Sequence, residues 1–169
     1  MDVLNFALTL EHLENAFYRE GLERFGERDL QRAEVLRGFG SRVRKDVRSN
    51  LVDIGEHEAT HVETLTGVIE ELGGDPVEEA HYDFGVDDAS EFIAVAGVLE
   101  NTGVSAYDGA IDRIENGELV TAGATIATVE ARHASYLNLL NDTDPFPKAF
   151  DQPKSMEEIL EAADPFLCG

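Results

Sequence analysis

The chain has one cysteine and no long apolar run, and each absence excludes a class of protein. Cys168 alone cannot form an internal disulfide, a zinc ribbon or a rubredoxin-type iron site. No apolar run reaches the roughly 18 residues that a membrane-spanning helix needs, so we expect no membrane association. The first residues, MDVLNFALTL, lack the basic region of a signal peptide and enter a helical pattern at once. We therefore expect a cytoplasmic protein.

Positive charge is also scarce. The 13 lysines and arginines stand against 35 acidic residues, for a net charge of −22, and only Lys45, Lys148 and Lys154 are lysines. Binding nucleic acid or an anionic membrane requires a cationic face, so we expect neither as a partner. Strong acidity with few lysines is typical of halophilic proteins, because molar salt screens charges to ~3 Å. An ordinary acidic protein is the alternative.

The main positive feature of the sequence is a helical periodicity of its apolar residues. A chain of 169 residues that is 43% apolar and 28% charged indicates one globular domain. The pattern predicts four long helices, at residues 3–25, 41–72, 90–114 and 119–141, and a short linking helix at residues 29–37. It predicts no strand. Ser41 is expected to cap the second long helix, and Ser90 to start the third. Two connections are short and the middle one is long, which predicts an all-α four-helix bundle over residues 1–141 with one long crossover.

Residues 142–169 form a tail that contains proline and phenylalanine. Its Ser-Met-Glu-Glu sequence at 155–158 matches a capping box and predicts one short helix. The first long helix carries a second apolar patch, turned roughly 90–120° from its main apolar stripe. The patch consists of Phe6, Leu10, Leu13 and Phe17. We expect the tail to pack on the bundle, and either the tail or a partner in a homodimer to cover this patch.

Two of the long helices carry a glutamate and a histidine three residues apart on their apolar stripe. A helix turns about 100° per residue, so relative directions follow from the numbering. Glu58 and His61 fall within the stripe of the second helix, which includes Val47, Leu51, Ile54, Leu65, Val68 and Leu72. Glu130 and His133 fall within that of the fourth, which includes Leu119, Ile126, Leu137 and Leu140. The two pairs are related by a constant offset of 72 residues, which indicates an internal duplication.

The other two long helices each have one glutamate on the stripe, followed seven residues later by a tyrosine. Glu11 precedes Tyr18, and Glu100 precedes Tyr107. A phenol beside a metal-bound carboxylate could orient it, although tyrosines on a stripe are more often plain core residues. Glu14 lies about 60° from Glu11 and is a further candidate for the same site. The pattern in chain order is Glu, Glu-x-x-His, Glu, Glu-x-x-His.

Chance must be weighed against this pattern. With 21 glutamates in 169 residues, five histidines give about 0.6 accidental Glu-x-x-His pairs, and Glu78 with His81 in the crossover fits that description. Direction and duplication, rather than spacing, separate the other two pairs from it. His12 and His57 point off the stripes and are expected at the surface or on the flank of the stripe.

Electrostatics favours a metal centre at these residues. Four glutamates in an apolar core are strongly destabilising unless they are paired or neutralised. Arg113 and Arg132 are expected to point outward, so no cationic side chain is available. Two divalent cations would balance four carboxylates, and two neutral imidazoles would complete the ligand set. A satisfied polar core without metal is the alternative.

The sequence resembles the ferritin-like di-metal carboxylate superfamily over nearly its whole length. The segments that carry the resemblance are LNFALTLEHLENAFY, EHEATH, VLEN, VEARH and PFPKAFDQPKSMEEILEAADPF, the last of which is similar to the ferritin-like domain family that includes desiccation-related proteins. The resemblance implies two iron or two manganese ions. It implies as ligands Glu11, Glu58, His61, Glu100, Glu130 and His133. Of these, Glu58 and Glu130 would be bridging, and no other catalytic side chain is expected.

The resemblance also implies chemistry. Such sites react with dioxygen, peroxide or ferrous iron, so we expect an oxidoreductase of oxidative or stress defence: a ferroxidase, a peroxidase or a protein similar to manganese catalase. With one cysteine in the chain, an electron donor would have to be external. The alternatives are a non-catalytic stress-associated protein with a structural metal site and, less favoured, a subunit of an iron-storage cage.

Overall fold

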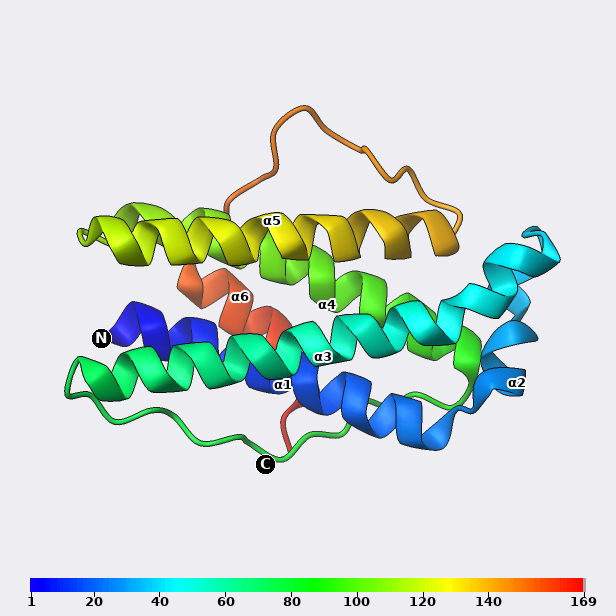
Figure 1. Ribbon diagram of the computed structural model, residues 1–169, viewed down its shortest axis with the longest axis horizontal. Coiled ribbons are helices and arrows are strands. Elements are labelled where there is room, and N and C mark those ends of the chain that lie inside the picture. Colours follow the sequence, from blue (N-terminus) through cyan, green and yellow to red (C-terminus); the bar gives the residue numbers. More distant parts are fainter. Residues whose placement is uncertain (169) are drawn as a thin grey trace.

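The computed structural model describes residues 1–168, and this part of the chain is all helical apart from turns and loops (Figure 1). The only β-bridge within it pairs Tyr82 with Leu167. The long helices are α1 (Asp2–Arg24), α3 (Ser41–Glu71), α4 (Ala89–Ala110) and α5 (Gly117–Leu140). The short ones are α2 (Glu27–Gln31), η1 (Glu34–Leu36), η2 (Ile111–Arg113), α6 (Met156–Ala163) and η3 (Asp164–Phe166). The predicted all-α bundle is confirmed.

The four long helices pack as two neighbouring pairs, α1 with α3 and α4 with α5. A short connection, residues 111–116, joins α4 to α5. Residues 25–40, which contain α2 and η1, join α1 to α3 and are nearly as long as the middle segment, so the expected short connection between the first two long helices is wrong. The segment 72–88 leads from the end of α3 back along the bundle to the start of α4, as Figure 1 shows in green. This is the expected long crossover. No helix within residues 1–168 is long and apolar enough to cross a membrane.

The helix ends differ in detail from the prediction. Ser41 is the first residue of α3, and the capping position is Gly40, which has no side chain to offer. At α4 the cap is Asp88, whose carboxylate accepts hydrogen bonds from the backbone N–H of Ser90 and Glu91. Aspartate is among the strongest N-caps, so the helix begins one residue before Ser90. The expected linking helix at 29–37 is two separate turns, α2 and η1.

Apolar side chains form two layers across the bundle, one on each side of a polar centre. On α3, Leu51 and Ile54 belong to one layer, and Leu65 and Ile69 belong to the other. The turn between them carries the inward glutamate and histidine. The other long helices contribute to both layers in the same way, with Leu13, Phe17, Ile93 and Leu137 in the first and Leu4, Leu8, Tyr107 and Ile126 in the second. The polar centre therefore lies in the middle of the bundle.

The second apolar patch of α1 is covered by the chain itself. Phe6 and Leu10 pack in one cluster with Ile159 of α6, which is fully buried. Phe17 packs edge-on against Phe84 of the crossover, with ring centroids 5.0 Å apart. Upstream of α6, the backbone N–H of residue 154 donates to the carbonyl of Ser105 in α4 at 3.1 Å. Segments of the tail and the crossover thus occupy the surface that a dimer partner could have used.

Candidate metal centre

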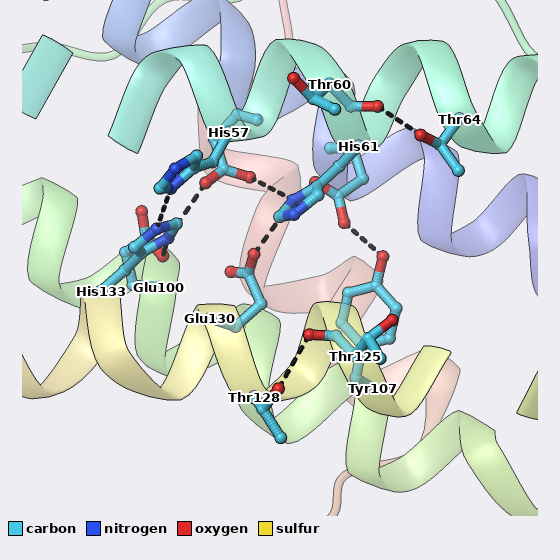
Figure 2. Close-up of polar contacts among 12 residues, drawn as sticks. His57, Thr60, His61, Thr64, Glu100, Tyr107, Thr125, Thr128, Glu130 and His133 are labelled. Atoms are coloured by element: carbon cyan, nitrogen blue, oxygen red, sulfur yellow. Dashed lines mark hydrogen bonds and ion pairs between the residues drawn. The ribbon is translucent and has the colours of Figure 1, made fainter. Parts of the chain in front are cut away.

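The six side chains expected as ligands meet in the centre of the bundle, although they come from four helices. Each is 9% exposed or less. Figure 2 shows His61, Glu100, Glu130 and His133 directed into the space between the helices. Their placement by element is Glu11 on α1, Glu58 and His61 on α3, Glu100 on α4, and Glu130 and His133 on α5.

Both histidines face the centre through the same ring nitrogen. His61 Nδ1 lies 3.1 Å from an oxygen of Glu58, one helical turn earlier on α3, and 3.1 Å from an oxygen of Glu11 on α1. His133 Nδ1 lies 3.1 Å from Glu100 Oε2 on α4 and 3.1 Å from Glu58 Oε1. A spacing of three residues places both members of each Glu-x-x-His pair on one face of a helix. Each imidazole thereby presents a donor atom to the same space as the carboxylates.

These donor atoms form two adjoining groups. The first contains Glu11, Glu58, His61 and Glu130, and the second contains Glu58, Glu100, Glu130 and His133. Within each group, one ligand atom from every residue lies within 4.8 Å of the others. The two groups share Glu58 and Glu130. That is the arrangement in which two carboxylates can bridge a pair of cations.

Two tyrosines hold the carboxylates that are not shared between the groups. Tyr18 on α1 donates its hydroxyl hydrogen to Glu100 on α4 at 2.5 Å, and Tyr107 on α4 donates to Glu11 on α1. Each tyrosine therefore serves the glutamate of the other helix. Its own helix's glutamate is seven residues away, which is about 10 Å along the axis. Burial raises the pKa of both phenols well above the usual value, so each keeps its hydrogen and remains a donor.

The centre carries more acid than base. Five buried glutamates face two histidines, and the buried charged side chains in the described residues include no lysine or arginine. Burial raises the pKa of Glu14 and Glu130 well above the usual value, and the neighbouring carboxylates raise it further. Burial raises the pKa of Glu11 to about 7, even though the contact with His61 opposes that rise. Without a cation, burial therefore favours the protonated form of these three carboxyl groups.

The histidines and Glu58 shift in the opposite sense to what burial alone would cause. Burial would raise the pKa of Glu58, but close contacts with both imidazoles outweigh it and lower the pKa to about 2. Burial would lower the pKa of the histidines, yet the carboxylates beside them raise it to about 12 for His61 and about 9 for His133. The protonated imidazoles thus balance part of the negative charge of the carboxylates. A metal ion that binds to the same nitrogens must release their protons.

Three carboxylate oxygens in the centre lack a hydrogen-bond donor among residues 1–168. They are Glu58 Oε1 and both oxygens of Glu130. His133 Nδ1 lies 3.1 Å from Glu58 Oε1 and His61 Nδ1 lies 3.3 Å from Glu130 Oε1, but neither contact has hydrogen-bond geometry. Buried polar atoms are rarely left without a partner. The unsatisfied oxygens belong to the two shared glutamates, so the donor set fits a pair of cations between the groups.

Glu14, the further candidate, is buried next to this centre. In the register that matches Glu11 to Glu100, residue 14 corresponds to residue 103, which is glycine. A Cβ atom at Gly103 would lie 3.0 Å from Glu14 Oε1 and 3.0 Å from Glu130 Oε2. The glycine therefore leaves the space that the Glu14 carboxyl group uses. Neither group of ligand atoms includes Glu14, and its role as a ligand stays a prediction.

The expectation for His57 was incomplete. His57 is exposed, as expected, but its ring contacts the centre, because its Nδ1 lies 2.9 Å from His133 Nε2 (Figure 2). The sequence contained a signal for this contact, since residues 57 and 61 are four apart and hence only about 40° apart around the helix. His12 has no such contact, and its Nε2 lies 3.1 Å from the carbonyl oxygen of Val77 in the crossover.

Comparison with known proteins agrees with this geometry. The sequence model of the ferritin-like domain matches residues 1–142, which is most of the chain. The chain is a member of the ferritin-like domain family. The resemblance to the ferritin-like superfamily is thereby confirmed, while the narrower likeness to desiccation-related proteins stays a prediction. No curated protein matches the chain. In this ferritin-like protein the matched region contains all six expected ligands and ends just after α5.

Proposed function

We propose that this ferritin-like protein binds two iron or two manganese ions between α1, α3, α4 and α5 and acts as an oxidoreductase on dioxygen, peroxide or ferrous iron. The observation that supports this most is the pair of adjoining ligand groups that share Glu58 and Glu130. An excess of buried carboxylates with no protein cation to balance it supports the same proposal. When bound, the metal pair would supply the redox chemistry that the side chains of the centre cannot perform.

The residues around the centre have defined tasks in this proposal. The six ligands would hold the metals, with His61 and His133 binding through Nδ1. Tyr18 and Tyr107 fix the orientation of Glu100 and Glu11, because hydrogen-bonded carboxylates are held in one rotamer. The apolar layers on either side exclude water from the carboxylates, which strengthens their attraction to cations.

The same burial favours a second candidate function. Glu11, Glu58, Glu100 and Glu130 are all fully buried, and His61 and His133 are only 9% and 5% exposed. A site so enclosed could hold metal chiefly to stabilise the bundle, because a ligand that binds only the folded state stabilises that state. In this alternative the protein is a stress-associated protein without turnover.

The setting of the proposed activity rests on composition. A high-salt environment is supported by the strong acidity and the small number of lysines, and a cytoplasmic location stays a prediction. One cysteine offers no second redox centre within the chain, so electrons for repeated turnover would come from an external donor. Storage of iron in a cage is the least supported option, since no feature of the described surface calls for it.

Elemental analysis of the protein purified without added metal tests the metal centre. We expect two iron or two manganese ions per chain, and less than one in the variant Glu58→Gln/His133→Ala. The matched control is Glu78→Gln/His81→Ala, which removes the exposed Glu-x-x-His pair of the crossover. The control should retain both ions. Equal metal content in the two variants would show that the ligand assignment is wrong.

Oxygen measurements then separate the candidate functions. A ferroxidase consumes oxygen when ferrous iron is added, and a manganese catalase releases oxygen from peroxide. A protein that holds two ions but does neither, and that unfolds at a lower temperature after chelation, would support the structural alternative.

A further inference from the structure

His57 contacts the centre but belongs to neither group of ligand atoms. Its ring lies nearly parallel to that of His133, with an angle of 9° between the planes and centroids 5.2 Å apart, and the two rings meet at their edges. The Nδ1 atom of His57 and the Nε2 atom of His133 are 2.9 Å apart, which is hydrogen-bond distance. Figure 2 shows the two rings next to each other, one from α3 and one from α5, with a dashed line between their nitrogens.

The direction of this hydrogen bond follows from the other side of the His133 ring. His133 Nδ1 faces Glu58 and Glu100 in the centre. When that nitrogen binds a cation, the ring hydrogen must be on Nε2, because a neutral imidazole has one N–H. His133 Nε2 then donates, and His57 Nδ1 accepts. Such a partner fixes both the tautomer and the orientation of a ligating imidazole.

The half of the centre that contains His61 lacks an equivalent hydrogen bond within residues 1–168. The offset of 72 residues that relates Glu58 to Glu130 and His61 to His133 relates His57 to Val129. Valine has no polar atom in its side chain, so it cannot accept a hydrogen bond from an imidazole. Within residues 1–168, the polar contacts of His61 all use Nδ1. The internal duplication therefore does not include the position of His57, which is valine in the second copy.

We propose that His57 is a positioning residue that makes the two metal positions unequal, so that the ion at His133 and Glu100 binds more tightly than the ion at His61 and Glu11. This inference rests on the proposed metal centre and extends it. Removing the partner of a ligating histidine typically weakens metal binding by about 10- to 100-fold. His57 is exposed, so its loss leaves no cavity in the core. The effect should therefore be confined to the metal ions.

Titration of the metal-free, full-length protein with Mn²⁺ by calorimetry tests the proposal. We expect two binding steps in the wild type. His57→Val should weaken the tighter step by about 10- to 100-fold and leave the weaker step unchanged. His57→Asn should restore the tighter step, because the asparagine oxygen can accept the same hydrogen bond. Val129→His, the reciprocal change, should tighten the weaker step.

A spectroscopic measurement separates positioning from a general structural effect. In protein loaded with Zn²⁺ and labelled with ¹⁵N in histidine, the Nε2 hydrogen of His133 should give a hydrogen-bonded imidazole signal. The signal should be present in the wild type and in His57→Asn, and absent in His57→Val.

Each outcome has one meaning. Two equal binding constants in the wild type, or a His57→Val variant that weakens both steps alike or neither, would overturn the proposal while leaving the metal centre intact. Binding of fewer than two ions by the wild type would overturn the metal centre itself. Unequal binding without any reaction with oxygen or peroxide would support the role of His57 and reject the proposed redox function.

Discussion

The metal-free protein should lose stability as the pH rises from about 5 to about 6.5, and Glu11 sets the minimum size of the loss. Burial raises the pKa of Glu11 to about 7 in the folded protein, against 4.5 for the ordinary group. In this pH range the folded chain keeps the proton and the unfolded chain releases it. Each such group lowers the free energy of unfolding by about 1.4 kcal/mol per pH unit. Glu11 alone therefore contributes a loss of about 2 kcal/mol.

The other ionisable groups of the centre also change the free energy of unfolding with pH, in this range or outside it. Glu14 and Glu130, whose pKa burial also raises, add to the loss in the same direction. The raised pKa of His61 and His133 has little effect below about pH 6.5, because both are protonated in the unfolded chain as well; above it they add to the loss. The lowered pKa of Glu58 costs stability only as the pH falls below about 4.5.

Metal should oppose this trend. Ligands must lose their protons to bind a cation, so affinity rises with pH. Because a bound ion stabilises the folded state by RT ln(1 + [L]/Kd), the stability difference between the loaded and the metal-free protein should widen as the pH rises. Excess Mn²⁺ is the suitable ion because it stays soluble and divalent across this range.

Urea unfolding followed by circular dichroism measures both effects, with chelator or with Mn²⁺, in roughly 1 M salt to screen the surface charges. Glu14→Gln keeps the side-chain volume and removes one titrating group, so its loss between the two pH values should be smaller than that of the wild type. Glu78→Gln, at an exposed crossover position, is the control and should behave as the wild type. A metal-free protein that became more stable between about pH 5 and about pH 6.5 would refute the reasoning.

Two further substitutions test the packing of the centre. Tyr107→Phe removes the hydrogen bond to Glu11 and leaves a buried carboxylate oxygen without that donor, so chemical denaturation should show a loss of about 1–3 kcal/mol. Gly103→Ala places a methyl group 3.0 Å from two carboxylate oxygens, so it should lower both stability and metal content, as measured by melting and elemental analysis. Gly67→Ala on α3 is the control, because the same methyl group meets nothing within 4 Å there, and it should stabilise the protein by up to about 1 kcal/mol. A loss of stability at Gly67 would mean that the loss at Gly103 does not come from the nearby carboxylates.

Much of the fold and of the candidate site could be predicted because both depend on helix geometry. Turning by 100° per residue separates Glu58 and His61, which face inward, from the exposed Glu56 and Glu63 of the same helix. The constant offset between the two Glu-x-x-His pairs is likewise visible in the sequence alone. The long segment between the second and third long helices was enough to predict a bundle with a crossover there, although the connection at 25–40 is nearly as long.

Contacts between helices could not be read in this way, since they depend on how the helices are rotated and shifted against one another. The sequence shows a tyrosine seven residues after the glutamate of each helix, but only packing decides which carboxylate it contacts: Tyr18 meets Glu100 and Tyr107 meets Glu11. It also left two occupants for the second apolar patch of α1, and only the folded chain brings Ile159 there.

The sequence by itself thus determined which side chains face the core, because that direction is a property of a single helix. The tertiary structure alone decided which of those side chains meet. Helix geometry places His57 near the face of His61, but only packing brings it to His133 across the gap between α3 and α5.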